Sequence, residues 1–179
     1  MSEQIFKSKI AKRLKTLRKE KGLSLDATAK LTSVSKAMLG QIEREESSPT
    51  IAVLWKIASG LNASFSSFFT HPEEVDIAQR TFPHDENMQI KTLFEYSPDS
   101  GMEMFEITLS HNLEQLSTPH SVGVVEHIIV RSGTLSVFYN DTWHTLEKGQ
   151  TCRFMSDQAH GYKALSERCV FENIICYPN

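Results

Sequence analysis

The spacing of apolar residues changes once along this chain of 179 residues, and that change limits the folds it can adopt. Before residue 70 the apolar side chains recur at helical steps, as in Phe6, Ile10, Leu14 and Leu17. From Met88 onward they alternate with polar residues, which is typical of half-buried strands. We therefore predict a two-domain α + all-β protein, with a helical domain at 1–70, a linker at 71–87 rich in proline and acidic residues, and a β domain at 88–179.

The helical part contains repeated start and stop signals. Gly22 is expected to end the first helix, and Ser24, Ser35, Thr50 and Ser64 are plausible N-caps for the helices that follow. These signals predict five short helices. The second and third are separated by a tight turn, which makes them a helix-turn-helix.

The β part contains eight short runs with period-two alternation, from MQIKTLFEY to RCVFENIICY. The segments between them are too short for crossover helices, so a parallel βαβ array is excluded. We predict a β-sandwich or barrel.

The charge is divided unevenly between the two parts. Residues 1–70 hold twelve Lys and Arg against six Asp and Glu, and the remainder holds seven against sixteen, although the whole chain has a net charge of only −3. A basic front half favours an anionic partner such as nucleic acid. No apolar run is long enough to span a membrane and no signal peptide is visible at the start, so we expect a cytoplasmic protein with no membrane partner and with reduced cysteines.

The helix expected at 35–43 separates its residues by face. Leu39 and Ile42, together with Val34 before the helix, belong to the core side. The opposite side is small and polar, which suits insertion into the DNA major groove. It carries Lys36, Ala37, Gly40, Gln41 and Arg44.

The segment VSKAMLGQIERE, followed by SPT and LWKIASGLN, resembles the Xre/Cro-like helix-turn-helix family, whose domain is lambda-repressor-like. The resemblance implies that Lys36, Ala37 and Gln41 face bases while Ser24, Arg44 and Thr50 face the DNA backbone. Leu25, Thr28 and Ser33 depart from the usual pattern. The predicted DNA-binding set is Ser24, Ser35, Lys36, Ala37, Gly40, Gln41, Arg44 and Thr50.

The second half resembles a cupin, a small β-barrel of the jelly-roll type. Glu126 followed by HIIVRS and Gly133 fits the first cupin motif, with His120 preceding it, and Gly149 eleven residues before His160 fits the second. The resemblance implies a site for Zn²⁺ or another divalent metal at His120, Glu126 and His160, although Thr118 stands where a first histidine is usual. The alternative is a metal-free pocket for an organic effector, formed by His120, Glu126, Tyr139, His160 and Tyr162.

Together these features predict a sequence-specific DNA-binding transcriptional regulator that is a homodimer on double-stranded operator DNA. Its cupin domain would sense a small-molecule effector, with a bound metal as one option. Two alternatives stay open at this point. The first is a cupin metalloenzyme of the dioxygenase or isomerase kind fused to a DNA-binding domain, and the second is a structural nucleoid-type protein that binds DNA without sequence preference.

Overall fold

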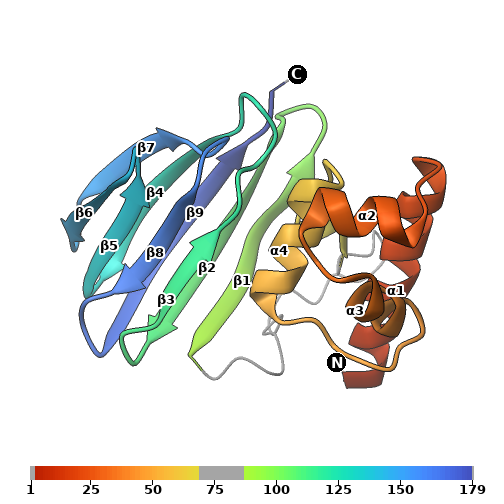
Figure 1. The fold of residues 1–179 in the computed structure, drawn as a ribbon. Helices are drawn as coiled ribbons and strands as arrows, with labels where there is room; N and C mark the ends of the chain where they lie inside the picture. The colour runs from red at the N-terminus through yellow and green to blue at the C-terminus, as the bar shows by residue number, and fades with distance from the viewer. Residues whose placement is uncertain (1–2, 69–86, 179) are drawn as a thin grey trace. The chain divides into compact units, whose positions relative to one another are not determined.

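The computed structural model describes residues 3–68 and 87–178, and the chain divides into two compact units, 1–79 and 80–179 (Figure 1). Apart from Asn87, the predicted linker at 71–87 lies outside the described residues, so its bounds stay a prediction. Within the described ranges, no helix has both the length and the apolar character needed to cross a membrane.

The first unit is helical, as predicted, but its last element is shorter than expected. Its elements are α1 (Glu3–Glu20), α2 (Leu25–Thr32), α3 (Lys36–Glu43), α4 (Ile51–Gly60) and a 3₁₀ turn η1 (Ser66–Phe68). The prediction of five α-helices is therefore wrong for the described residues, since Ser64 starts only a single turn. That turn is enough to bury Phe65 and Phe68, and the Phe65 ring stacks on Trp55 at 3.8 Å.

The predicted caps explain where these helices begin and end. The hydroxyls of Ser24, Ser35 and Thr50 each accept a backbone N–H three residues ahead, at 3.1–3.3 Å, which confirms them as N-caps. Gly22 has φ of 64° and ends α1. The tight turn between α2 and α3 places Ser33 in the left-handed region with φ of 53°.

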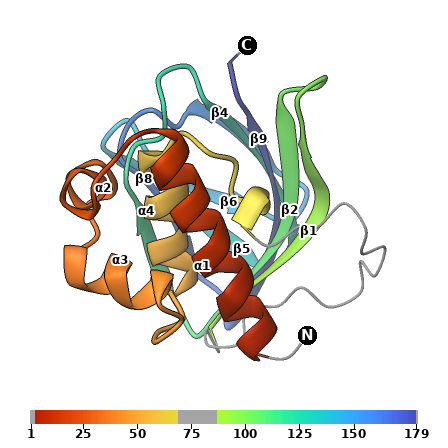
Figure 2. The same ribbon diagram turned by 90° about the vertical axis from the view of Figure 1, so that its right-hand side faces the viewer.

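One apolar stripe of α1 packs against the rest of the helical unit, and Figure 2 shows the ribbon of α1 beside that of α3. Phe6, Ile10, Leu14 and Leu17 are all buried there. At Gly60 a Cβ would lie 2.5 Å from the backbone oxygen of Leu31, so α4 approaches α2 more closely than any side chain allows.

The second unit consists of two antiparallel sheets. Its strands are β1 (Met88–Ser97), β2 (Met102–Ser110), β3 (Glu114–Ser117), β4 (Val125–Ser132), β5 (Thr134–Tyr139), β6 (Thr142–Glu147), β7 (Thr151–Met155), β8 (His160–Ala164) and β9 (Arg168–Cys176). One sheet has the order β1-β2-β9-β4-β7 and the other β3-β8-β5-β6. The predicted barrel is therefore corrected to a two-sheet sandwich, because no ladder joins the two sheets among the described residues.

A ninth strand, β3, was absent from the sequence prediction. It contains a single apolar residue, Leu116, which is 56% exposed, so the strand has no apolar alternation to reveal it. Pairing with β8 defines β3 instead. The three cysteines are free, but only Cys169 is fully buried.

Candidate functional site

The exposed side of α3 carries most of the residues predicted to meet DNA. Lys36, Ala37 and Gln41 are exposed, whereas Leu39 and Ile42 are buried against the helical core. The side of the helix that the sequence assigned to the core is therefore the side that packs. The opposite side presents a cation, a methyl group and an amide, which are groups that meet base edges in a major groove.

Helix α3 is held in place by a partly buried ion pair to α1. Arg18 donates from Nε and Nη2 to the two carboxylate oxygens of Glu43, at 2.6 and 2.9 Å, and from Nη1 to the backbone oxygen of Leu23 at 2.9 Å. The hydrogen bond to Glu43 raises the pKa of Arg18. A bidentate pair with both side chains largely covered fixes the orientation of α3 relative to α1.

Two cations predicted to meet DNA, Lys36 and Arg44, are paired with nearby carboxylates. Lys36 Nζ lies 2.7 Å from Asp26 Oδ2, and Arg44 makes a bidentate pair with Glu46 at 2.8 Å. All four side chains are more than half exposed. Such exposed pairs contribute little to stability, so exchanging them for a phosphate costs little.

Gly40 does not lie on the open face, contrary to the sequence interpretation. It is buried, and a Cβ at this position would lie 3.1 Å from Nη1 of Arg44. The Arg44 guanidinium covers the glycine because it extends back along α3 from the C-cap position. A direct approach of DNA to Gly40 would require Arg44 to move.

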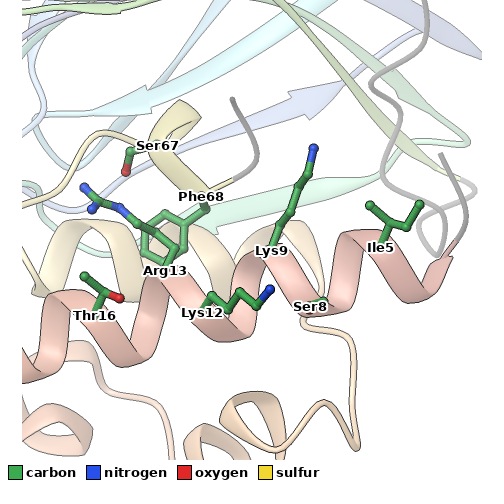
Figure 3. Close-up of a pocket in the computed structure, with 8 residues that line it drawn as sticks. All are labelled: Ile5, Ser8, Lys9, Lys12, Arg13, Thr16, Ser67 and Phe68. Atoms are coloured by element: carbon green, nitrogen blue, oxygen red, sulfur yellow. The ribbon is translucent and has the colours of Figure 1, made fainter. Parts of the chain in front are cut away.

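A hollow in the helical unit lies away from the predicted DNA-binding residues. It has a volume of about 510 Å³ and is cationic on its α1 side, where Lys9, Lys12 and Arg13 line it. Figure 3 shows Arg13 extending toward Ser67 and Phe68 of η1. None of the eight residues in the predicted DNA-binding set lines this hollow.

In the β unit, the three predicted metal ligands come together. Glu126 lies on β4 and His160 on β8, in different sheets, and His120 lies in the loop before β4. Nε2 of His120 is 3.0 Å and Nε2 of His160 is 3.3 Å from Glu126 Oε1, and one ligand atom from each residue lies within 4.8 Å of the others. The three residues that the cupin motifs brought together in the sequence analysis are therefore neighbours in the structure.

The other carboxylate oxygen of Glu126 is fully engaged. Tyr162 donates its hydroxyl to Oε2, and Asn173 donates from Nδ2 to the same oxygen at 2.8 Å. The backbone oxygen of Gln158 accepts from Nδ1 of His160 at 2.8 Å, which leaves Nε2 of that ring directed at the carboxylate. The cluster therefore presents one carboxylate oxygen and two imidazole nitrogens toward a common point.

Burial and charge oppose each other at this site. Burial raises the pKa of Glu126, but the charge of His160 and the hydrogen bonds from both histidines outweigh it, so the pKa lies well below its usual value. Burial lowers the pKa of His160, but the nearby Glu126 carboxylate raises it further, so the net shift is upward. Burial and the same carboxylate raise the pKa of Tyr162. These shifts favour the ionised form of Glu126, the protonated form of His160 and the neutral form of Tyr162.

Two further residues belong to this region. Tyr139 stacks its ring on that of Phe154 with centroids 4.9 Å apart, and the Phe154 ring lies 5.7 Å from that of His160. Asn173 was missed by sequence reasoning, although a polar residue at an inward position of the apolar run FENII was the available signal. Its Oδ1 is buried without a hydrogen-bond partner, so this site has an acceptor to offer.

The donor set suits a divalent ion of the first transition row. Two neutral imidazoles and one carboxylate oxygen are ligands used for Zn²⁺ and Fe²⁺, with positions left open for other groups. A carboxylate this deeply buried also requires partners for its charge. The His120–Glu126–His160 group can therefore bind a metal.

Comparisons with known proteins agree with both halves of the chain. Residues 14–68 match the HTH_3 helix-turn-helix family model. The HTH-type transcriptional regulator SutR of Escherichia coli (strain K12) is 45% identical over 166 residues, which cover 92% of this chain and 93% of that protein. The crystal structure of an HTH_3 family transcriptional regulator from Vibrio cholerae is 58% identical, covers 99% of this chain and 100% of its own, and superposes with a TM-score of 0.92.

The second unit has its own structural relative. The Cupin_2 domain of an XRE family transcriptional regulator from Enterobacter cloacae is 35% identical, covers 52% of this chain and 100% of its own, and has a TM-score of 0.51. These similarities account for the helix-turn-helix and for the two-sheet domain that follows it. The chain belongs to the HTH_3 (Xre-type) family of transcriptional regulators, with a helix-turn-helix DNA-binding domain followed by a cupin domain.

Proposed function

We propose that the cupin domain senses a small-molecule effector at the His120–Glu126–His160 centre and that this binding changes the affinity of the helix-turn-helix for its operator. The observation that carries the proposal is a fully buried carboxylate with one oxygen held by Tyr162 and Asn173 and the other turned toward two imidazoles. Such a group is costly to bury without a ligand or ion to complete it.

The helix-turn-helix would read DNA with α3. Lys36, Ala37 and Gln41 would face base edges, because they are exposed on the side of α3 opposite its packed side. The caps Ser24, Ser35 and Thr50 would donate their hydroxyl hydrogens to phosphates, since their oxygens already accept from the helix backbone. Arg44 would exchange Glu46 for a phosphate.

If the cupin centre also binds a divalent metal ion, His120, Glu126 and His160 would be its ligands. A divalent ion bound there would supply open coordination positions for an oxygen or nitrogen of the effector. Tyr162 and Asn173 keep Glu126 from turning, so the carboxylate offers a single oxygen. Asn173 Oδ1 would accept from a hydroxyl or amine of the effector.

Sensing would reach the DNA by linkage. An effector that prefers one arrangement of the two domains shifts the population toward it, and operator affinity changes by no more than that preference. We propose that the regulator acts as a homodimer. Two α3 helices one DNA turn apart would recognise an inverted repeat that a single helix-turn-helix binds only weakly, so a change in their arrangement would change operator affinity.

Base reading is tested with two substitutions on the reading face. Gln41→Ala should weaken binding to the cognate promoter fragment about tenfold or more while sparing random DNA. Lys36→Ala should weaken both, if it also meets phosphate, and should lower the salt dependence of binding. An equal loss on both DNAs for Gln41→Ala would contradict base reading.

Sensing is tested by a thermal-melt screen over divalent metals, amino acids and small carboxylates. A ligand of the folded cupin raises its melting temperature by mass action, and Glu126→Gln should abolish that rise. Gel shifts at stated salt, with and without the ligand found, then measure coupling. A ligand that raises the melting temperature but leaves operator affinity unchanged would contradict the sensor role.

An enzyme on the same centre is the second candidate, because a two-histidine, one-carboxylate set with open positions also suits O₂ chemistry on iron. The names of the regulators similar to this chain favour binding over turnover. Product formation by iron-loaded protein from the ligand found in the screen would favour the enzyme.

A further inference from the structure

The outer face of the five-stranded sheet carries a continuous apolar band. Residues directly opposite each other in an antiparallel pair lie on the same face. The strand register therefore places Phe94, Met104, Ile174, His127 and Arg153 in one row that crosses the sheet from β1 to β7. Two residues along the strands, a second row consists of Met102, Cys176, Val125 and Met155.

The other described residues of the β unit cover this band only partly. Phe94 is 63% exposed and Met155 is 44% exposed, at opposite edges of the sheet. Met102, Met104 and Ile174 between them are half-buried. The inward rows of the same strands are buried and hold Glu126, so the outer band is not part of the domain's own core.

One half of the face is hollow. A depression of about 490 Å³ on the β4 and β7 side of β9 is lined on this face by Val125, His127, Arg153, Met155 and Cys176, and it continues around the β7 edge to Tyr139, Asn140, Phe154 and Gln158. The exposed ring of Phe94 lies on β1, on the other side of β9. The face therefore has a projection on one side of its central strand and a hollow on the other side.

We propose that this face is the homodimer interface, with a two-fold axis that runs along β9 in the plane of contact. With this axis, β1 of one copy packs over β7 of the other. Each Phe94 side chain then enters the depression beside β7 of the partner. There the ring meets the guanidinium of Arg153, which attracts an aromatic face. The inference rests on the proposed homodimer and adds the surface and the residues that form it.

Two further observations favour a second copy as the occupant. The five strands of this sheet have 10, 9, 9, 8 and 5 residues, so one face presents roughly 650 Å², which is of the order of the ~800 Å² per partner of a stable interface. The next row holds Glu106 and Glu172, and Glu172 already binds Arg131 at 2.5 Å. The two Glu172 carboxylates, one from each copy, would lie near the axis, but each would be neutralised by its own Arg131.

The test uses the full-length chain in sedimentation velocity over a range of concentrations. Wild type should be a dimer, and Phe94→Ala and Met155→Ala should each weaken self-association about tenfold or more. Leu116→Ala is the matched control, because Leu116 is similarly exposed but lies on the other sheet, and it should leave the dimer unchanged. Both test residues are exposed on edge strands, and circular dichroism should show each variant folded.

Cysteine crosslinking gives a second, independent measurement. Cys176 lies on β9 near the proposed axis, and packed sheets are about 10 Å apart, so a short bismaleimide should join the two copies. Cys176→Ser should abolish the covalent dimer, and Phe94→Ala should strongly reduce it. A covalent dimer that persists in Cys176→Ser would overturn the assignment of the axis.

The remaining outcomes separate this inference from the proposed function. A dimer that is insensitive to Phe94→Ala and Met155→Ala would overturn the interface while leaving the proposed homodimer intact. A wild-type monomer would overturn both, and would point to the helical unit of the same chain or a different protein as the occupant of the band. Loss of operator binding by Gln41→Ala is measured separately and depends on neither result.

Discussion

The two candidate sites of this protein hold their charges in opposite ways. On α3 the pair Lys36–Asp26 has side chains that are 59% and 64% exposed, whereas Glu126 in the cupin domain is 1% exposed and has four polar partners. An exposed pair exchanges partners at little cost, but a buried cluster loses much if one member is removed. The face of α3 that is proposed to read DNA is therefore adaptable, whereas the side chains of the cupin centre are already held in place by one another.

Among the substitutions that test this comparison, Glu126→Gln should have the largest effect on the free energy of unfolding. A neutral amide cannot accept from Tyr162, Asn173 and both histidines, so several buried groups lose a partner. We expect the free energy of unfolding of the chelator-treated cupin domain to fall by about 3–5 kcal/mol. Urea unfolding followed by near-UV circular dichroism measures the change.

The control for Glu126→Gln is Glu114→Gln. Glu114 also makes an ion pair, with Lys163 at 3.1 Å, but both side chains are well exposed. Its loss should change the free energy of unfolding by no more than about 0.5 kcal/mol. Equal effects of the two substitutions would show that the buried cluster is not specially stabilised.

Within the helical domain, the pair Arg18–Glu43 behaves as a buried site and sharpens the comparison. Its side chains are 15% and 9% exposed and its geometry is bidentate. Glu43→Gln should lower the free energy of unfolding of this domain by about 2 kcal/mol and weaken operator binding, since α3 loses its anchor. Chemical unfolding followed by helical circular dichroism provides the measurement.

Glu46→Gln is the matched variant on the open face. Glu46 binds Arg44 in the same bidentate manner but is exposed, and no measurable change in stability is expected. If Glu46→Gln destabilised the domain as much as Glu43→Gln, burial would not be the factor that distinguishes the two pairs.

The stability that the cupin centre contributes should also depend on pH. The pKa of Glu126 is lowered on folding from 4.5, so its contribution to stability is present above pH 4.5 and is lost as the pH falls through the folded value. The pKa of His160 is raised on folding from 6.5, so its contribution is full below pH 6.5 and is lost as the pH rises through the folded value. Both contributions coexist between pH 4.5 and 6.5.

We therefore expect the chelator-treated cupin domain to gain most from this site between pH 4.5 and 6.5. The quantity to measure is the melting temperature of wild type minus that of Glu126→Gln, as a function of pH in EDTA. His160→Asn should remove the decline on the alkaline side. A difference that stays constant from pH 4 to 9 would contradict the ionised cluster.

How far the sequence predicted the molecule depended on whether a residue's role is local. Ser24, Ser35 and Thr50 were identified as caps because an N-cap depends only on the next few residues, and the structure confirms them. His120, Glu126 and His160 were found through motif spacing, and their convergence agrees with it. The contact of each residue with DNA or metal stays a prediction.

Features that depend on contacts between residues far apart in the chain could not be predicted from the sequence. Strand β3 exists because β8 pairs with it, and Asn173 matters because β9, which pairs with β4, places it beside Glu126. Gly40 was placed on the open face from helical periodicity alone, but the long Arg44 side chain folds over it. In each case the decisive neighbour was either far away in the sequence or a flexible side chain whose direction no pattern encodes.

The smallest expected effect comes from Asp26→Asn on the reading face. The substitution removes one negative charge and releases Lys36 Nζ, which Asp26 holds at 2.7 Å. Because the pair is exposed, thermal stability should not change, but affinity for any DNA should rise by about two- to threefold at low salt, since one repulsive charge is gone and Lys36 no longer has to exchange partners. In Lys36→Ala the same Asp26 substitution should have less effect, because only the repulsion remains to be relieved. Fluorescence anisotropy on random and cognate duplexes at two salt concentrations measures both. A loss of affinity in Asp26→Asn would mean that Asp26 positions Lys36 for the DNA, and the reading face would then be preorganised like the cupin centre.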